Sequence, residues 1–167
     1  MPISVYIFIL IQMAVVGYWD LKTKKISNYW SILNLIVFII ILCIFSDIYI
    51  LKMAHLKYPF IILIVGIVLF FKNIMGAGDV KYLSSSFLLV PEFYHEKLVW
   101  YLLFFTIIFA GVLALKNTFI NLGSILTHLK NREFLMIKTF YGTKFSYSPV
   151  ILFSWIYWGW EINVFMF

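Results

Sequence analysis

The sequence predicts an all-α fold, a polytopic membrane helix bundle with about six transmembrane helices. The chain has 167 residues, of which 64% are hydrophobic and only 12% are charged, and its mean hydropathy is +1.01. Soluble domains contain roughly 45–50% apolar and about 25% charged residues, and a chain this short leaves much of its surface exposed. Soluble enzymes, disordered tails and nucleic-acid-binding modules are therefore poor interpretations.

Apolar stretches between charged residues mark the expected spans, because a helix needs roughly 20 mainly apolar residues to cross a bilayer. We expect a single transmembrane domain over residues 1–167, with spans at 3–19, 29–45, 58–75, 80–90, 98–115 and 150–167. The fourth is short and is stopped by Pro91. It can act as a span only if its N-terminus lies inside the protein or in a water-filled cleft. The continuous Ile, Leu and Phe runs lack the alternation of a membrane barrel.

The basic residues predict the topology. The net charge is +6, from 13 Lys and Arg against 7 Asp and Glu. Ten of the 13 bases fall in the loops 20–28, 72–81 and 116–148, and three fall in 46–57 and 91–97. Since cytoplasmic loops carry the excess of bases, the first set is expected in the cytoplasm and both termini outside. Topology then explains the positive charge, and no nucleic-acid partner is expected.

The remaining loop and terminal features have ordinary interpretations. Met1 to Trp19 has no charged side chain and the first bases follow it, which suits a retained helix and not a removable signal peptide. Residues 119–137 of the long loop read as an amphipathic segment on the cytoplasmic leaflet. The aromatic residues Trp155, Trp158 and Trp160 predict an interfacial belt at the outer end of the last span.

No metal or cofactor is expected. Cys43 is the one cysteine, which excludes an internal disulfide and a cysteine-cluster zinc site, and it is expected to be a small core residue. The histidines, His55 and His95 in expected outer loops and His128 in the long cytoplasmic one, show no metal-ligand spacing.

Two of the seven acidic residues stand out as candidates for chemistry. Asp20 ends the first span on its cytoplasmic side, and Asp79 opens the short fourth span from the same side. Ionisable groups at that depth tend to face a bundle interior or a water-filled cavity. The alternative is that Asp20 belongs to a charged helix end beside Lys22 and that Asp79 caps its own helix.

The glycines around Asp79 favour the functional interpretation. Gly76 and Gly78 allow a tight turn and a close approach of another chain. Such a turn at membrane depth must be buried in protein or line a water cavity. Two carboxylates facing each other there would share a proton. The ionised one could take a proton from water and the protonated one could polarise an amide, which predicts peptide hydrolysis without a metal.

The sequence predicts supporting roles for four residues in and after the glycine motif. Lys81, two positions after Asp79, could bias the charge of the acid pair. The three serines Ser84, Ser85 and Ser86 have no nearby base, so they read as small groups for close helix packing and not as nucleophiles.

Two motifs carry a family resemblance. The sequence Gly76-Ala77-Gly78-Asp79-Val80-Lys81 resembles the GxGD motif of the type IV prepilin peptidases, which are membrane aspartyl proteases. The stretch from Asp20 to Asn28 is similar to the family's Asp, basic stretch and Ile-Pro-Asn, with Ser27 in place of the usual proline. Tyr147-Ser148-Pro149 resembles the entry into the family's last helix.

The resemblance implies an aspartic-type endopeptidase that removes the short basic leader from prepilins, pseudopilins or archaellins. The cut lies at the cytoplasmic face of the prokaryotic plasma membrane, before a hydrophobic helix that stays in the bilayer. Asp20 and Asp79 carry over as the catalytic pair, and Gly76 and Gly78 as the glycines that shape the loop. The chain lacks the paired cysteines of longer relatives, so it resembles the compact members and no methyl transfer is predicted. The precursor, the pilus, secretion or competence system and the oligomeric state stay open.

Two other functions remain open at this point. A presenilin-like protease would use the same two acids to cut inside a transmembrane segment. A transporter or channel would use them to bind a proton or a cation, although transporter sites usually lie at the midplane and these acids lie at the border.

Overall fold

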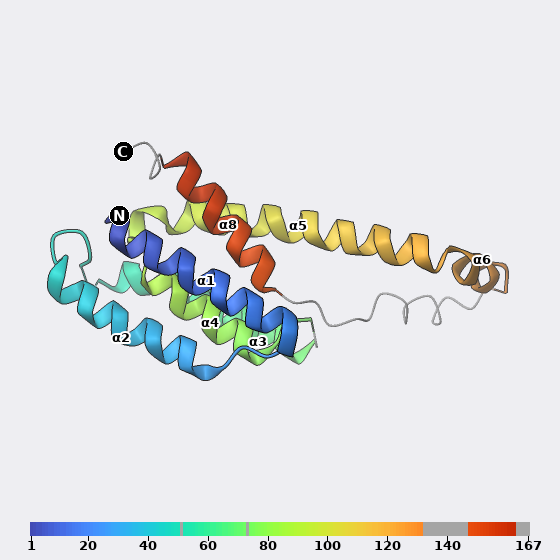
Figure 1. The fold of residues 1–167 in the computed structure, drawn as a ribbon, viewed down its shortest axis with the longest axis horizontal. Coiled ribbons are helices and arrows are strands. Elements are labelled where there is room, and N and C mark those ends of the chain that lie inside the picture. Colours follow the sequence, from blue (N-terminus) through green and yellow to red (C-terminus); the bar gives the residue numbers. More distant parts are fainter. Residues whose placement is uncertain (51, 73, 132–146, 163–167) are drawn as a thin grey trace.

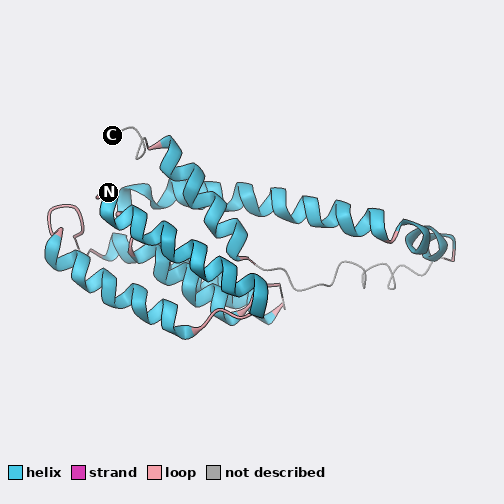
Figure 2. Ribbon diagram, in the orientation of Figure 1, coloured by secondary structure: helices cyan, strands magenta, loops and turns pink. Residues whose placement is uncertain are grey.

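The computed structural model describes residues 1–50, 52–72, 74–131 and 147–162. The described residues contain helices and no strand, which confirms the all-α prediction (Figure 2). In chain order the elements are α1 (Ile3–Thr23), α2 (Asn28–Ile44), α3 (Met53–Phe71), α4 (Ala77–Leu88), the 3-10 helix η1 (Glu92–Tyr94), α5 (His95–Ile120), α6 (Leu122–Lys130) and α8 (Ser148–Glu161) (Figure 1).

The membrane helix bundle is confirmed, and a helix lies at each of the six expected stretches. Among the described residues, three helical stretches are long and apolar enough to cross a membrane: α1, α3 and the stretch Glu92–Ile120 that contains α5. The apolar helix α2 has 17 residues, α8 has 14 and α4 has 12. At about 1.5 Å per residue, α4 alone is about 18 Å long, so the number of six crossings stays a prediction.

Two groups of three helices form the bundle. Helices α2 and α3 pack against α4, and helices α1 and α5 pack against α8. We call these groups the α4 layer and the α8 layer. The end of α1, the start of α4 and the start of α8 lie at one end of the bundle, and the start of α1 and the end of α8 lie at the other (Figure 1).

Tryptophans on α8 pack inside the bundle. Trp155 and Trp158 are fully buried, and only Trp160 is exposed, at 73%. The predicted interfacial belt is therefore wrong for the first two. They face inward because Trp155 packs edge-on against Phe87 of α4 at 5.4 Å and Trp158 contacts Tyr6 of α1 at 5.9 Å. The first contact joins the two layers.

The segment expected as a loop over 116–148 is partly helical. Helix α5 continues to Ile120, and α6 follows directly. Lys116 does not end α5 because lysine is a good helix former. The predicted amphipathic segment 119–137 is helical where the structure describes it, up to Asn131, and residues 132–137 lie outside the described part. The same holds for residues 163–167 of the last expected span.

The short helix α4 lies inside the protein, with most of its residues buried. Its last carbonyls have no partners within the helix, and lipid cannot provide any. Side chains from other elements fill this need, at distances of 2.8–3.0 Å: His95 at the carbonyls of Phe87 and Val90, His55 at that of Leu88, and Tyr49 at that of Leu89. The carbonyl groups at the C-terminal end of this short helix are thus satisfied by other elements.

The histidine placement differs from the prediction. His55 lies in α3 and His95 in α5, and their side chains are 2% and 0% exposed, so neither belongs to an outer loop. Because a carbonyl oxygen only accepts hydrogen bonds, the Nε2 atoms of both rings must donate. The buried imidazoles are stabilised by hydrogen bonds to the end of α4, where carbonyl groups remain without N–H partners in the helix.

Candidate active site

Asp20 lies in the last turn of α1 and is 3% exposed. The helix ends just after it, because Lys24 adopts a left-handed conformation (φ 56°) and its N–H bonds the Asp20 carbonyl at 2.8 Å. Ser27 then caps α2 by accepting from the N–H of Tyr29 at 3.4 Å. The serine in place of the expected proline therefore has a defined role in starting the next helix.

The side chain of Asp20 is held by the last helix. Ser148 Oγ, itself 3% exposed, donates a 2.7 Å hydrogen bond to Asp20 Oδ2. Ser148 is the first residue of α8, followed by Pro149 in the first turn, where proline is favoured. The sequence indicated the helix entry at this place but not the contact with Asp20. Hydrogen bonds of a hydroxyl to a carboxylate are among the stronger ones in proteins.

Asp79 is the third residue of α4 and is 6% exposed. Gly76 is the N-cap residue, and its N–H donates to Asp79 Oδ2 at 3.2 Å. The alternative that Asp79 merely caps its own helix is thus partly right, since the carboxylate reaches back to the cap backbone. The same carboxylate is buried at the end of the bundle where Asp20 lies.

The two acids interact electrostatically. Asp79 belongs to α4, outside the three helices that are long enough to cross a membrane. Burial raises the pKa of Asp79, the negative charge of Asp20 raises it further, and the Gly76 N–H lowers it, with a result of about 6. The end of α1 and the start of α4 lie at the same end of the bundle (Figure 1), so the structure places both buried acids there, one from each layer.

At Gly78, the segment that carries Asp79 comes into close contact with the turn that follows Asp20 and α1. A Cβ atom on Gly78 would lie 2.5 Å from the backbone oxygen of Ile26, in the turn that follows α1. No side chain larger than hydrogen fits at that distance, and a backbone oxygen cannot rotate away. At Gly76, a Cβ atom would lie 3.2 Å from Asp79 Oδ2. Both glycines thus lie in close contact with the surroundings of the acids.

Lys81 lies beside the site. Its Nζ donates to Oδ1 of Asn28, the last residue of the first motif, at 3.4 Å, and its side chain is exposed. It thus joins the start of α4 to the start of α2. An influence of Lys81 on the charge of the acid pair stays a prediction.

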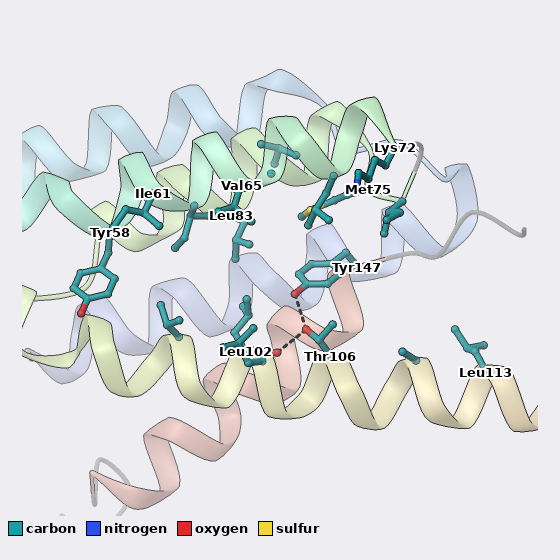
Figure 3. Close-up of a pocket in the computed structure, with 18 of the residues that line it drawn as sticks. Tyr58, Ile61, Val65, Lys72, Met75, Leu83, Leu102, Thr106, Leu113 and Tyr147 are labelled. Carbon is teal, nitrogen blue, oxygen red and sulfur yellow. Dashed lines mark hydrogen bonds between the residues drawn. The ribbon is translucent and has the colours of Figure 1, made fainter. Parts of the chain in front are cut away.

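An apolar groove of about 830 Å³ lies between α3 and α5 (Figure 3). One stripe of each helix forms its walls: Tyr58, Ile61, Ile62, Val65, Gly66, Leu69 and Lys72 on α3 and its end, and Val99, Leu102, Leu103, Thr106, Ala110, Leu113, Ala114 and Asn117 on α5. Val80, Leu83, Ile74, Met75 and Tyr147 complete the lining. The Tyr147 hydroxyl lies 2.6 Å from Thr106 Oγ1.

The groove adjoins both acidic residues. Val80 follows Asp79 directly, and Tyr147 precedes the Ser148 that binds Asp20. Figure 3 shows Tyr58 near one end of the groove and Lys72 and Met75 near the other. The stripe on α5 covers 99–117, which is about 27 Å of helix, close to the thickness of the hydrocarbon core.

The described residues contain no group of three or more His, Cys, Asp or Glu side chains able to hold a metal ion. Cys43 is exposed and not in the core, because its side of α2 faces outward. Its thiol is apolar enough for contact with lipid.

Comparison with known families gives a match over most of the chain. The model of the type IV leader peptidase family matches residues 7–116, a segment that includes both Asp20 and Asp79. No curated protein and no solved structure matches the chain. Since the matched segment covers well over half of the sequence, the chain belongs to the type IV leader peptidase family.

Proposed function

We propose that this peptidase is a membrane aspartyl endopeptidase that removes the short basic leader from prepilin-like precursors. The observation that carries the proposal is the burial of two carboxyl groups, Asp20 from α1 and Asp79 from α4, at the same end of the bundle (Figure 1). Family membership supports the substrate class. Burial and the proximity of a second acid are the conditions under which two carboxyl groups share a proton.

The pair acts by activating water. The ionised carboxylate takes a proton from a water molecule, and the water oxygen attacks the carbonyl carbon of the scissile amide. The protonated carboxyl donates its proton to the carbonyl oxygen. When the C–N bond breaks, a proton passes to the amide nitrogen, which leaves as the new N-terminus. One water is consumed for each bond cut, and no covalent enzyme intermediate forms. The two acids titrate as a unit.

The groove is the place for the part of the precursor that stays in the membrane. Its apolar walls on α3 and α5 are about as long as one membrane-crossing helix. Because Val80 and Tyr147 adjoin the acids, a helix in the groove would present its end to Asp20 and Asp79. We place the acids at the cytoplasmic face, since the sequence predicts ten of the 13 bases in the cytoplasmic segments 20–28, 72–81 and 116–148, and Asp20 and Asp79 belong to the first two.

Conservative substitution of the acids tests the proposal. In purified protein in a bilayer disc, Asp20→Asn and Asp79→Asn should each abolish cleavage of a leader-bearing precursor. The control is Asp47→Asn, which makes the same change at an exposed acid between α2 and α3 and should leave cleavage unchanged. Full cleavage by either of the first two variants overturns the proposal.

The site of the cut separates this function from the others. Cleavage just before the hydrophobic helix supports leader removal, whereas cleavage deep in the helix indicates a presenilin-like protease. Proton or cation flux in sealed vesicles without any peptide product would indicate a transporter. Both acids lie at one end of the bundle, which favours a cut at the membrane border.

A further inference from the structure

A chain of buried hydrogen bonds crosses the bundle between its two layers. Gln12 of α1 donates to Asn34 of α2 at 2.6 Å, and Asn34 donates to Ser85 and Ser86 of α4 at 3.0 and 3.2 Å. All four side chains are at most 6% exposed. We call these four residues the Asn34 node. It contains none of the residues of the candidate site.

The donor and acceptor roles within the Asn34 node follow from the last acceptor of the chain, the backbone oxygen of Tyr82. Both serine hydroxyls donate to the backbone oxygen of Tyr82, at 2.9 and 2.8 Å. Each hydroxyl has a single hydrogen, so Ser85 and Ser86 can only accept from Asn34. The amide nitrogen of Asn34 must therefore face the serines, and its oxygen must face Gln12. Gln12 Oε1 accepts no hydrogen bond among the described residues, so the Gln12 amide is bonded through its nitrogen, to Asn34.

The node lies at a matching distance from both acids. Asp20 follows Gln12 by eight residues on α1, and Asp79 precedes Ser85 and Ser86 by six and seven residues on α4. These spacings correspond to about 12 Å and about 10 Å along helices that run in opposite directions (Figure 1). From the node, both helices reach the acid-bearing end over nearly equal lengths.

Polar contacts are what can fix such a relation between helices in a membrane. Lipid tails are as apolar as leucine, so apolar packing alone resists sliding and rotation of one helix against another only weakly. Helix α1 packs mainly on α8, and α4 packs mainly on α2 and α3. The bond between Gln12 and Asn34 therefore couples the layer that carries Asp20 to the layer that carries Asp79.

From this placement we infer that Asn34 is a positioning residue, which sets the register of α1 against α4 so that Asp20 and Asp79 face each other. The inference rests on the proposed function for its effect on cleavage, but its geometric part does not. It also gives Ser85 and Ser86 a role beyond close packing. Ser84 does not take part in the node; its hydroxyl donates to the Pro59 carbonyl of α3 at 2.8 Å.

A crosslinking experiment tests the geometric part without catalysis. Cys43→Ser removes the one native thiol, and Asp20→Cys with Asp79→Cys then allows a short bifunctional thiol reagent to join the two positions in the full chain. Adding Asn34→Leu should slow crosslinking by about tenfold or more, because the register is lost. Asn121→Leu is the matched control, since Asn121 bonds only the carbonyl of Asn117 in its own helix.

A kinetic experiment with both native acids tests the effect on cleavage. Asn34→Leu should lower kcat by about tenfold or more with little change in KM, since the groove is intact. The alkaline limb of the pH profile should move to lower pH, because the charge of Asp20 acts less on Asp79. Asn34→Gln keeps an amide oxygen and an amide nitrogen in the side chain at position 34, so it should recover part of kcat. A merely structural role would change the amount of folded protein and not the pH profile.

The outcomes separate cleanly. Should Asn34→Leu fail to fold, the double variant Ser85→Ala with Ser86→Ala removes only the two hydroxyl acceptors and should have the same effects. Crosslinking and kcat within about twofold of the parent for these variants overturns the inference. A parent that forms no crosslink contradicts it as well. Crosslinking between positions 20 and 79, together with no cleavage of the precursor by the protein that has both native acids, removes the proposed function while the Asn34 node stands.

Discussion

Ser148 donates a hydrogen bond of 2.7 Å to Asp20 from 128 residues further along the chain. The bond joins the first residue of the last helix to the acid at the end of the first helix. Helices α1 and α8 also pack against each other. The orientation of Asp20 is therefore set by contacts within the α8 layer and does not depend on Asp79. The other acid is oriented within the α4 layer by Gly76.

Removal of the Ser148 hydroxyl should weaken catalysis without loss of the protein. Hydrogen bonds to charged groups contribute about 1.5–3 kcal/mol, so Ser148→Ala should lower kcat by roughly ten- to a hundredfold. Steady-state cleavage of a leader-bearing precursor measures the effect. Ser148→Thr keeps the donor and should retain most activity. The contact has no catalytic importance if the alanine variant matches the parent in kcat.

Gly78 should tolerate no side chain. In Gly78→Ala the new methyl group would lie 2.5 Å from the Ile26 carbonyl oxygen, so the turn after α1 or the start of α4 must shift. Such overpacking costs about 1–3 kcal/mol, and the shift separates the acids, so cleavage should fall by at least about tenfold.

Gly111→Ala is the matched control, because no atom lies within 4 Å of a Cβ atom at that position. Alanine is favoured over glycine in a helix by about 1 kcal/mol, so this variant should keep full activity and unfold at the same or a higher temperature. Equal activity of the two variants would show that the close approach at Gly78 is unimportant.

Cleavage should depend on pH through Asp79. Its pKa is raised to about 6, first by burial and second by Asp20, so the pair holds its proton below that pH and loses it above. The rate of cleavage should therefore decline as pH rises through about 6. A profile of kcat/KM on both sides of this value measures the decline. A rate that stays constant there contradicts proton sharing by the pair.

The same pKa predicts the stability of Asp79→Asn. A raised pKa means that ionisation costs the native state more than the unfolded chain, so the native contribution is full below 3.8 and is lost as pH rises through about 6. A neutral asparagine avoids this loss. It should stabilise the protein at neutral pH by on the order of 3 kcal/mol, with no gain in acid. Thermal unfolding of Asp79→Asn and of the parent, at neutral pH and below pH 3.8, tests the sign of this stability difference.

Blocking the groove should impair binding and not chemistry. Ala110 lines the groove and its neighbour Gly111 does not. Ala110→Trp should raise KM for the precursor by about tenfold or more at unchanged kcat, because contacts made equally in ground and transition states are lost. Gly111→Trp places the same side chain on the adjacent position and should leave KM unchanged. Identical KM values for the two variants would exclude the groove as the place of the precursor helix.

The sequence predicts the parts of this protein that rest on composition or on a local motif. The apolar stretches predict the helices because a membrane requires continuous apolar runs. Asp20 and Asp79 stand out because acids are unusual at that depth, and the glycines stand out because a turn there must be buried or line a water cavity. The family match agrees with the resemblance that these motifs carry.

The contacts that position these motifs could not be predicted from the sequence. Asn34 lies 22 residues from Gln12 and 51 from Ser85, and no spacing rule relates them. His95 was misplaced because sequence distance from an apolar run does not distinguish a loop histidine from a buried one. Its burial depends on the unsatisfied carbonyls at the end of α4, which only the assembled bundle brings within reach.

Fixation of α4 at its far end and in its middle has a consequence for the length of this segment. Its far end is held by His55, His95 and Tyr49, and its middle by Asn34. Inserting or deleting one residue between Asp79 and Ser85 would turn the acid by about 100° around the helix axis while the rest stayed in place. Any homologue that keeps these anchors must therefore keep this count of residues, whereas the length of α5 beyond the groove is free to vary.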